Sequence, residues 1–174
     1  MRQLRAFTLL ELLVTLAIAA SLLAAGVPSF QTYVKNQALA QASYRMVSDL
    51  RYARHAAVDR NQRVVMCPGT AGNGCADSPQ WEDGWIIFAD ANGDRLRQGD
   101  EELLRESPLL RGLSARSSRA RRRLSFFPDG SAPGSNATVW LCDDRGPRHG
   151  HQVRINLSGR IRATRAGDGE PTAR

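Results

Sequence analysis

The residues best suited to binding chemistry are arginines close to the carboxyl terminus. Residues 152–157 alternate polar and apolar side chains, and Arg160 and Arg162 follow directly after Gly159. A three-residue loop that ends at Gly159, with this glycine in the left-handed conformation, makes Arg154 face Arg162 in a β-hairpin. This register sorts the apolar residues inward and the arginines outward. Like charges opposite one another destabilise a sheet, so the pattern favours an anionic partner.

Phosphate is the anion that these side chains fit best, because the planar guanidinium fork matches phosphate geometry. Arg165 lies just beyond the hairpin and extends the candidate contact. A second basic cluster either extends a phosphate track or keeps a loop soluble; it contains Arg119, Arg121, Arg122 and Arg123. The alternative for the hairpin is a solvated edge in an arginine-rich protein. No aromatic-studded strand accompanies the arginines, so base stacking of the kind seen in single-strand binders is not indicated. We expect contacts to a phosphate backbone without sequence preference.

The distribution of charge points to the same third of the chain. The 174 residues carry a formal net charge of +7. Residues 111–174 hold 13 arginines against five acidic residues, whereas residues 1–110 hold 11 basic and 12 acidic residues. The carboxyl-terminal third is therefore the candidate surface for a polyanion.

One helix and several short strands must position these arginines. Residues 29–60 carry apolar side chains three and four positions apart, which predicts a helix with an apolar stripe and with Asp49 on its polar face. The stripe consists of Leu39, Ala42, Met46, Leu50, Ala53 and Ala57.

From Arg63 onwards the pattern changes to short β-branched and aromatic runs between glycine-rich turns. Residues 111–123 read as a basic, serine-rich loop. Strands after one long helix predict an α+β fold with an antiparallel sheet. We expect these strands at 63–67, 84–89, 101–106, 124–127, 138–142, 152–157 and 160–164.

The amino terminus reads as a membrane anchor. Arg2 and Arg5 precede an almost wholly apolar run over 7–27, which as a helix is roughly 30 Å long and spans a bilayer core. Glu11 lies within this run, where an unpaired carboxylate costs about 2.5–3.5 kcal/mol. Cleavage after Ala6 would place a new α-amino group four residues before Glu11, on the same helical face.

The segment from Arg5 to Glu11 resembles the class III signal of type IV prepilins and pseudopilins. The resemblance implies that a prepilin peptidase cuts after Ala6 and methylates Phe7, and that Glu11 docks the subunit onto a neighbour's amino terminus. Ala6 departs from the glycine that the family usually has there. Pro28 stands where pilins commonly have a helix-bending proline.

Further along, the chain resembles the GspH/FimT family of minor pilins and pseudopilins. The resemblance covers nearly the whole chain; its motifs are residues 81–90, Leu103-Leu104-Arg105, Phe127-Pro128-Asp129-Gly130 and Ser158-Gly159-Arg160-Ile161-Arg162. The last of these resembles the G-R-x-R element of FimT-type pilins. It implies that Arg154, Gly159, Arg160, Arg162 and Arg165 contribute to DNA binding in natural transformation.

Three cysteines in an exported domain indicate one disulfide and one remaining thiol. Cys67 and Cys75 are close in sequence across a flexible loop, so they are the favoured pair, and pairing with Cys142 is the alternative. Their spacing makes a poor zinc site.

The acidic segment Asp90, Asn92, Asp94 and Glu101 has much of the spacing of a calcium loop. Arg95 occupies the position where such a loop needs glycine, so a polar hairpin turn is the favoured interpretation and no metal is expected. The histidines have no nucleophile or carboxylate constellation around them. We therefore expect no enzymatic activity and no cofactor.

Taken together, these features predict a minor type IV pilin that assembles into a pilus and binds DNA for uptake. Its expected parts are a leader (1–6), a transmembrane and assembly helix (7–28), a globular domain (29–166) and a disordered tail (167–174). Expected partners are DNA, other pilin subunits, the prepilin peptidase and, before assembly, the inner membrane, with the head in the periplasm. The alternatives are a GspH-like pseudopilin of a type II secretion system and a pilus-tip subunit needed for assembly or adhesion.

Overall fold

The computed structural model describes residues 8–99 and 101–165, which form two units, one up to Gln37 and one from Ala38 onwards. The leader over 1–6, the methylation site Phe7 and the tail over 167–174 lie outside the described residues. The two units are described separately below.

The first unit is the apolar part of helix α1 (Leu9–Asp59). Thr8 caps the helix, because its hydroxyl accepts a hydrogen bond from the backbone N–H of Glu11 at 3.3 Å. Thr8 and Glu11 have the spacing of a capping box. The helix passes through Pro28 without ending. An 18-residue window reaches a mean hydropathy of 2.2, so the helix is long and apolar enough to cross a membrane.

The second unit contains the rest of α1, whose apolar stripe is buried as the spacing predicts. Leu39, Met46, Leu50, Ala53 and Ala57 are fully buried. The prediction for Asp49 is wrong, since this carboxylate is also buried. It accepts hydrogen bonds from Trp85, Ser107 and Arg105, and these partners outweigh the cost of removing it from water.

Nine strands form two antiparallel sheets in the described part of the chain, whereas the sequence pattern predicted one. The first sheet has the order β2-β1-β3-β4, and β6 also pairs with β1, on the edge that faces away from β3. Its strands are β1 (Val64–Thr70), β2 (Gly74–Cys75), β3 (Trp85–Ala89), β4 (Leu103–Ser107) and β6 (Leu124–Phe126).

The second sheet has the order β5-β7-β8-β9 and carries the arginines singled out above. Its strands are β5 (Ser114–Arg116), β7 (Ala137–Cys142), β8 (His151–Ile155) and β9 (Ile161–Arg165). The expected loop over 111–123 contains β5 and the 3₁₀ helix η1 (Arg119–Arg121), and a second 3₁₀ helix, η2 (Pro147–His149), precedes β8. The loop prediction failed because β5 has only three residues and forms by pairing with β7.

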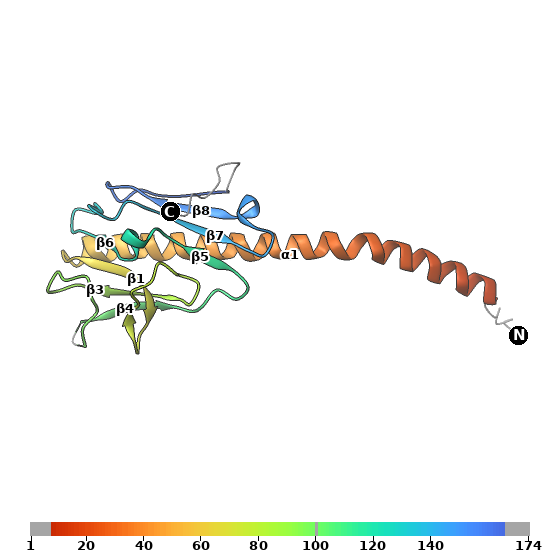
Figure 1. Ribbon diagram of the computed structural model, residues 1–174, viewed down its shortest axis with the longest axis horizontal. Helices are drawn as coiled ribbons and strands as arrows, with labels where there is room; N and C mark the ends of the chain where they lie inside the picture. Colours follow the sequence, from red (N-terminus) through yellow and green to blue (C-terminus); the bar gives the residue numbers. More distant parts are fainter. Residues whose placement is uncertain (1–7, 100, 166–174) are drawn as a thin grey trace, which may run out of the picture. The chain divides into compact units, whose positions relative to one another are not determined.

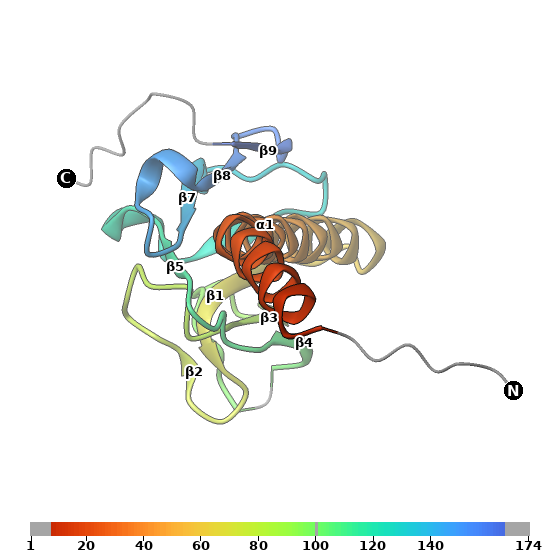
Figure 2. The same ribbon diagram turned by 90° about the vertical axis from the view of Figure 1, so that its right-hand side faces the viewer.

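The core lies where both sheets meet the second half of α1. In Figures 1 and 2, strands β7 and β8 lie on one side of this helix and β3 and β4 on the other. Buried residues of α1 join those of both sheets in one cluster, which includes Met66 and Ile87 from the first sheet and Val139 and Val153 from the second. This shared core fixes the second sheet against the helix.

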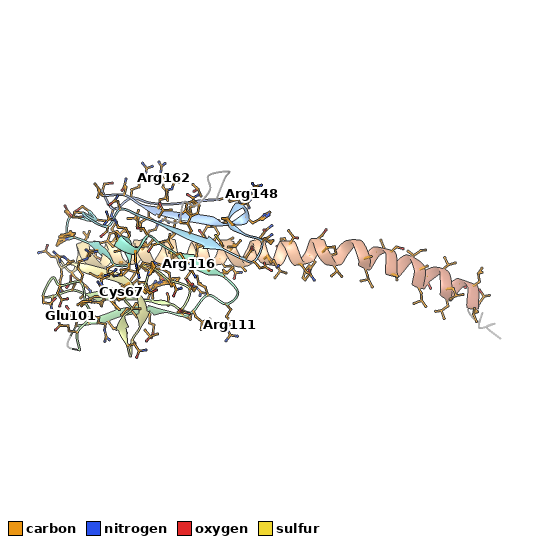
Figure 3. The ribbon with its side chains drawn as sticks, viewed as in Figure 1. Cys67, Glu101, Arg111, Arg116, Arg148 and Arg162 are labelled. Atoms are coloured by element: carbon orange, nitrogen blue, oxygen red, sulfur yellow. A yellow bond between two sulfur atoms is a disulfide. The ribbon has the colours of Figure 1, made fainter. Side chains whose placement is uncertain are left out.

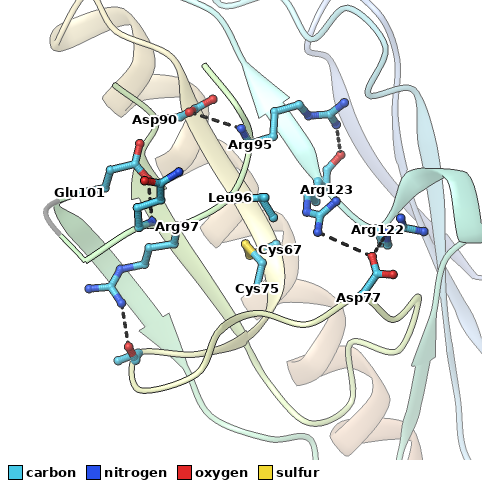
Figure 4. The surroundings of a disulfide bond; sticks show 12 residues. Cys67, Cys75, Asp77, Asp90, Arg95, Leu96, Arg97, Glu101, Arg122 and Arg123 are labelled. Atoms are coloured by element: carbon cyan, nitrogen blue, oxygen red, sulfur yellow. Dashed lines mark hydrogen bonds and ion pairs between the residues drawn. A yellow bond between two sulfur atoms is a disulfide. The ribbon is translucent and has the colours of Figure 1, made fainter. Parts of the chain in front are cut away.

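The opposite face of the first sheet has a smaller core next to the disulfide. Cys67 on β1 is bonded to Cys75 on β2, and Leu96 lies near the pair (Figure 4). Val65, Ile86 and Phe88 pack there with Cys67. The disulfide therefore closes the β1–β2 hairpin over a buried apolar layer.

Candidate nucleic-acid interface

The last hairpin has the register that its alternation predicts. Arg154 on β8 is directly opposite Arg162 on β9, and Ile155 is opposite Ile161. Both arginines are exposed, while Ile155 is buried. Gln152, expected on the exposed face, is buried there and accepts a hydrogen bond from Arg154 Nη2 at 2.8 Å.

Gly159 fixes how the hairpin turns. Its φ is 73°, in the left-handed region. A Cβ atom at this position would overlap the carbonyl oxygen of Gly130 and lie 3.1 Å from Nε of Arg54. Arg54, on α1, donates a hydrogen bond to that same carbonyl at 2.8 Å. Gly159 thus holds the hairpin against the 127–130 turn and the helix, and sets the position from which Arg160 extends.

The hairpin arginines form one wall of a groove of about 1120 Å³ on the outer face of the second sheet. This wall consists of Arg154, Arg160 and Arg162. The other wall comes from β5 and η1 and contributes Arg116, Arg119 and Arg121. Figure 3 labels Arg116 and Arg162, one from each wall. The fold therefore joins the hairpin to two of the four arginines of the second basic cluster, although more than 30 residues separate them in sequence.

Strand β7 forms the floor of this groove, since it lies between β5 and β8 in the sheet. Thr138, Trp140 and Cys142 line the groove and are half-buried, while the intervening Val139 and Leu141 are fully buried in the core. The period-2 alternation of a strand explains this division.

The wall that carries Arg116 is held by the segment before β3. The backbone N–H of Trp81 donates to the carbonyl of Ala115 at 2.7 Å, and the Trp81 indole donates to Ser117 Oγ at 3.0 Å. Trp81 is fully buried. These bonds explain why a three-residue strand keeps a defined position.

The electrostatics of the groove favour an anion. None of the groove-lining residues in the described part of the chain is acidic. Arg121 donates to the backbone oxygen and the side-chain oxygen of Asn136, at 2.8 and 3.0 Å, and Arg154 donates to Gln152. Among the carboxylates of residues 8–99 and 101–165, Glu82 alone contacts one of the six arginines: it lies 3.6 Å from Arg116, whose side chain is 60% exposed. Most of the positive charge is therefore available to a ligand.

Two titratable groups at this sheet have shifted pKa values. Burial raises the pKa of the Cys142 thiol, and the negative charge of Asp143 adds to this effect. Burial lowers the pKa of His151, and so does the positive charge of Arg165, which lies opposite it on β9. Both groups are therefore held in their neutral form near pH 7.

Comparison with known families identifies the chain. The model of the family described as type II transport protein GspH matches residues 42–159, which include the core part of α1 and most of the groove. The chain belongs to the GspH family.

Other comparisons agree with this placement in the GspH family. The prokaryotic N-terminal methylation motif matches residues 1–27. The type IV minor pilin FimU of Pseudomonas aeruginosa has 22% identity and a TM-score of 0.64, over 81% of this chain and 98% of its own. No curated protein sequence matches the chain.

Two further solved structures have the same fold at lower identity. The minor pseudopilin EpsH of the Vibrio cholerae type II secretion system has 10% identity and a TM-score of 0.53, over 75% of this chain and 98% of its own. GspH of Escherichia coli has 13% identity and a TM-score of 0.52, over 78% of this chain and 94% of its own. These likenesses show that the fold is the pilin-like α+β fold of the GspH family.

The structure separates the expected site residues into those that line the groove and those that do not. Arg165 is on the opposite face of β9 from Arg162 and is not among the groove-lining residues. Arg122 and Arg123 form ion pairs with Asp77, at 2.5 and 3.6 Å, on the side of the disulfide (Figure 4). Arg116 and Trp140, which the sequence reasoning did not assign to the site, line the groove instead. The expectation of no base stacking overlooked Trp140, which lies on β7 between the arginine-bearing strands β5 and β8. The alternation within 138–142 is the signal that would have placed Trp140.

The acidic turn uses its carboxylates to hold its own backbone. Asp90 Oδ1 accepts from the N–H of Gly93 at 2.9 Å, and Glu101 accepts from the N–H groups of Ala91 and Gln98, both at 3.0 Å. The N–H of Leu96 donates to Asp94, and this bond lowers the pKa of the Asp94 carboxyl. In the described ranges 8–99 and 101–165 no cluster of three metal-ligating side chains is present. The turn therefore has the geometry of a polar hairpin turn.

Proposed function

We propose that this member of the GspH family is a minor type IV pilin that binds DNA without sequence preference and serves DNA uptake in natural transformation. One observation carries the proposal: six arginines from two walls line a single groove, and no acidic side chain of the described part of the chain lines it. Phosphate groups are the ligand that such a surface fits, because guanidinium groups bind them bidentately. The role is binding and assembly, with no catalytic step.

Contacts of this kind predict how binding depends on salt. Each phosphate that the protein neutralises on duplex DNA contributes about −0.9 to the slope of log affinity against log salt concentration. Arginines that do not hydrogen-bond to base edges contact the DNA backbone. Such contacts position the DNA but do not distinguish one sequence from another. Affinity should therefore fall steeply with salt and vary little with sequence.

A charge-matched pair of double variants tests the groove. The full-length chain in detergent is titrated with labelled duplex DNA at two salt concentrations. Arg160→Gln with Arg162→Gln should weaken binding to all sequences alike and flatten the salt slope by roughly 2. The control, Arg111→Gln with Arg148→Gln, removes the same charge from two exposed positions outside the groove lining (Figure 3). Equal losses in both variants would refute the groove as the site. If the unmodified chain bound neither duplex nor single-stranded DNA at low salt, the DNA-binding function would be refuted.

The amino-terminal segment supports the assembly part of the proposal. Before assembly the chain is anchored in the inner membrane by a single span, with its head in the periplasm. Prepilin peptidase cuts after Ala6 and methylates Phe7, and the apolar span remains. Glu11 then pairs with the amino terminus of a neighbouring subunit in the pilus. Intact-mass analysis of the membrane-extracted protein should show loss of residues 1–6 plus one methyl group. Glu11→Ala should leave this processing intact while it impairs assembly, and retention of Met1 would refute it.

The second candidate is a minor pseudopilin of a type II secretion system. The family description and the likeness to EpsH favour it. In that function the ligands are other pseudopilins and exported proteins, and the groove arginines have no DNA to bind. Deletion of the gene separates the two: loss of transformation with normal secretion supports the pilin, and loss of secretion with normal transformation supports the pseudopilin.

A further inference from the structure

The groove floor contains an aromatic side chain that phosphate binding leaves without a role. Trp140 lies on the outer face of β7 and lines the groove, half-buried. Its neighbours along the strand on that face are Thr138 and Cys142, and the core side of β7 is filled by other residues. Trp140 is thus not needed to complete the core cluster.

Trp140 lies between the arginines of the two walls. Its cross-strand partners are Arg116 on β5 and Gln152 on β8, and Arg154 is the diagonal neighbour on β8. Directly opposed residues in a sheet have Cβ atoms about 5 Å apart, and diagonal neighbours remain within reach of long side chains. Trp140 therefore stands in the sheet between arginine-bearing positions on β5 and on β8.

The other two tryptophans have structural roles. Trp81 and Trp85 are buried, and their indole N–H groups donate to Ser117 at 3.0 Å and to Asp49 at 2.9 Å. Within residues 8–99 and 101–165, the indole of Trp140 makes no hydrogen bond. Trp140 is accordingly the tryptophan that a ligand in the groove can touch.

We infer that the groove binds single-stranded DNA, with an unpaired base stacked on Trp140 and the flanking phosphates held by arginines of both walls. This inference rests on the proposed DNA-binding function and defines the class of DNA. In a duplex the faces of the bases are covered by their neighbours, so only an unpaired strand offers a base to the groove floor. Aromatic side chains interleaved with arginines are the arrangement that binds single strands without sequence preference.

The size of the groove agrees with a short stretch of polymer. Its volume of about 1120 Å³ lies just above the range of about 300–1,000 Å³ that is typical of small-molecule sites. A single strand would use the floor and both walls.

A comparison of a single strand with bases, a single strand without bases and a duplex tests the role of Trp140. The full-length chain in detergent is titrated with a 12-residue oligothymidylate, with an abasic oligonucleotide of the same length and charge, and with a duplex. Base stacking is worth about 1–3 kcal/mol, so the oligothymidylate should bind about 5- to 150-fold more tightly than the abasic strand. Trp140→Leu should remove this difference and leave the abasic affinity and the salt slope unchanged. Trp140→Phe keeps an aromatic face and should retain most of the difference.

Intrinsic fluorescence gives a second readout that does not depend on stability. Oligothymidylate should quench the exposed part of the tryptophan emission, and Trp140→Phe should abolish this quenching while the strand still binds. Trp81 and Trp85 remain in that variant as internal controls.

The results of these titrations distinguish a failure of base stacking on Trp140 from a failure of DNA binding as a whole. If the chain binds duplex and abasic strands but shows no preference for bases, or if Trp140→Leu weakens every ligand equally, the stacking inference is wrong and the DNA-binding function stands. If the chain binds none of the three ligands at low salt, the DNA-binding function is wrong as well.

Discussion

Arg154 on β8 and Arg162 on β9 are direct cross-strand partners, and both side chains are exposed. Opposed like charges on a sheet lower stability by a few tenths of a kcal/mol up to about 1 kcal/mol. This destabilising pair lies in the wall of the groove. Loss of stability in exchange for positive charge on a surface is expected of a site that binds an anion.

Removal of one of these charges should stabilise the fold while it weakens binding. Arg162→Gln is expected to raise the free energy of unfolding by about 0.2–1 kcal/mol at low ionic strength. The gain should shrink at high salt, since exposed charges are screened. Chemical denaturation at two salt concentrations measures it, with Arg111→Gln as the control. A destabilised Arg162→Gln at low salt would show that repulsion is not the dominant interaction of this side chain.

The buried carboxylate of Asp49 should be the most sensitive polar group of the core. Its Oδ2 accepts from the Trp85 indole at 2.9 Å and from Ser107, and its Oδ1 accepts from Arg105 at 2.8 Å. Asp49→Ala leaves the buried indole N–H and hydroxyl without a partner, which is expected to cost about 3 kcal/mol. Asp59→Asn, at an exposed position of the same helix, should change stability by less than about 0.5 kcal/mol. A loss of similar size in both variants would contradict the role given to Asp49.

Two glycines with nearly the same backbone conformation allow the cost of backbone strain to be measured apart from the cost of a steric overlap. Gly159 and Gly134 have φ values of 73° and 71°, but a Cβ at Gly134 would meet nothing within 4 Å. Gly134→Ala should therefore cost about 1–2 kcal/mol from the left-handed conformation alone. Gly159→Ala should cost clearly more and should also weaken DNA binding, because the hairpin must shift away from Gly130. Thermal unfolding of both variants, combined with DNA titration, provides the comparison; equal costs would show that the close approach to Gly130 has no consequence.

The disulfide should contribute to stability without contributing to binding. Cys67 and Cys75 are eight residues apart, and closing a loop of this length in the unfolded chain is worth about 2.5 kcal/mol. Neither cysteine lines the groove. Cys67→Ser with Cys75→Ser should lower the free energy of unfolding by about that amount and leave DNA affinity unchanged. Loss of DNA binding by a folded double variant would show that the first sheet also supports the site.

Cys142 offers a chemical probe of groove occupancy. Burial raises the pKa of its thiol, so the fraction of reactive thiolate near pH 7 is smaller than for a free cysteine. Alkylation of the folded chain should be slow, should accelerate as pH rises past the ordinary thiol pKa, and should slow further when oligothymidylate fills the groove. Mass spectrometry of the alkylated chain gives the rates, and the denatured chain is the control. Unchanged alkylation with bound DNA would place the ligand outside the groove.

The parts of the site that depend on local rules could be predicted from the sequence. The hairpin register followed from the alternation in 152–157 and from the left-handed conformation that Gly159 supplies. The buried stripe of α1 followed from spacings of three and four residues. In each case a single segment contains the whole signal.

The parts that depend on distant partners could not be predicted in this way. β5 is too short to show a strand pattern, and its position comes from pairing with β7 and from bonds to Trp81. Asp49 is a polar residue whose burial depends on donors from β3 and β4. Arg122 and Arg123 turn towards Asp77, more than 40 residues earlier in the chain. No periodicity within one segment carries this information.

The two walls of the groove have a consequence for how this scaffold can diverge. All six arginines project from the outer face of the second sheet or from its bordering loops, whereas the core residues of β7 and β8 lie on the opposite face. Substitutions in one wall of the groove therefore need not change the packing of the core. A relative with the same backbone and neutral residues at 116–121 or 154–162 would keep the fold and present a groove that suits a different ligand.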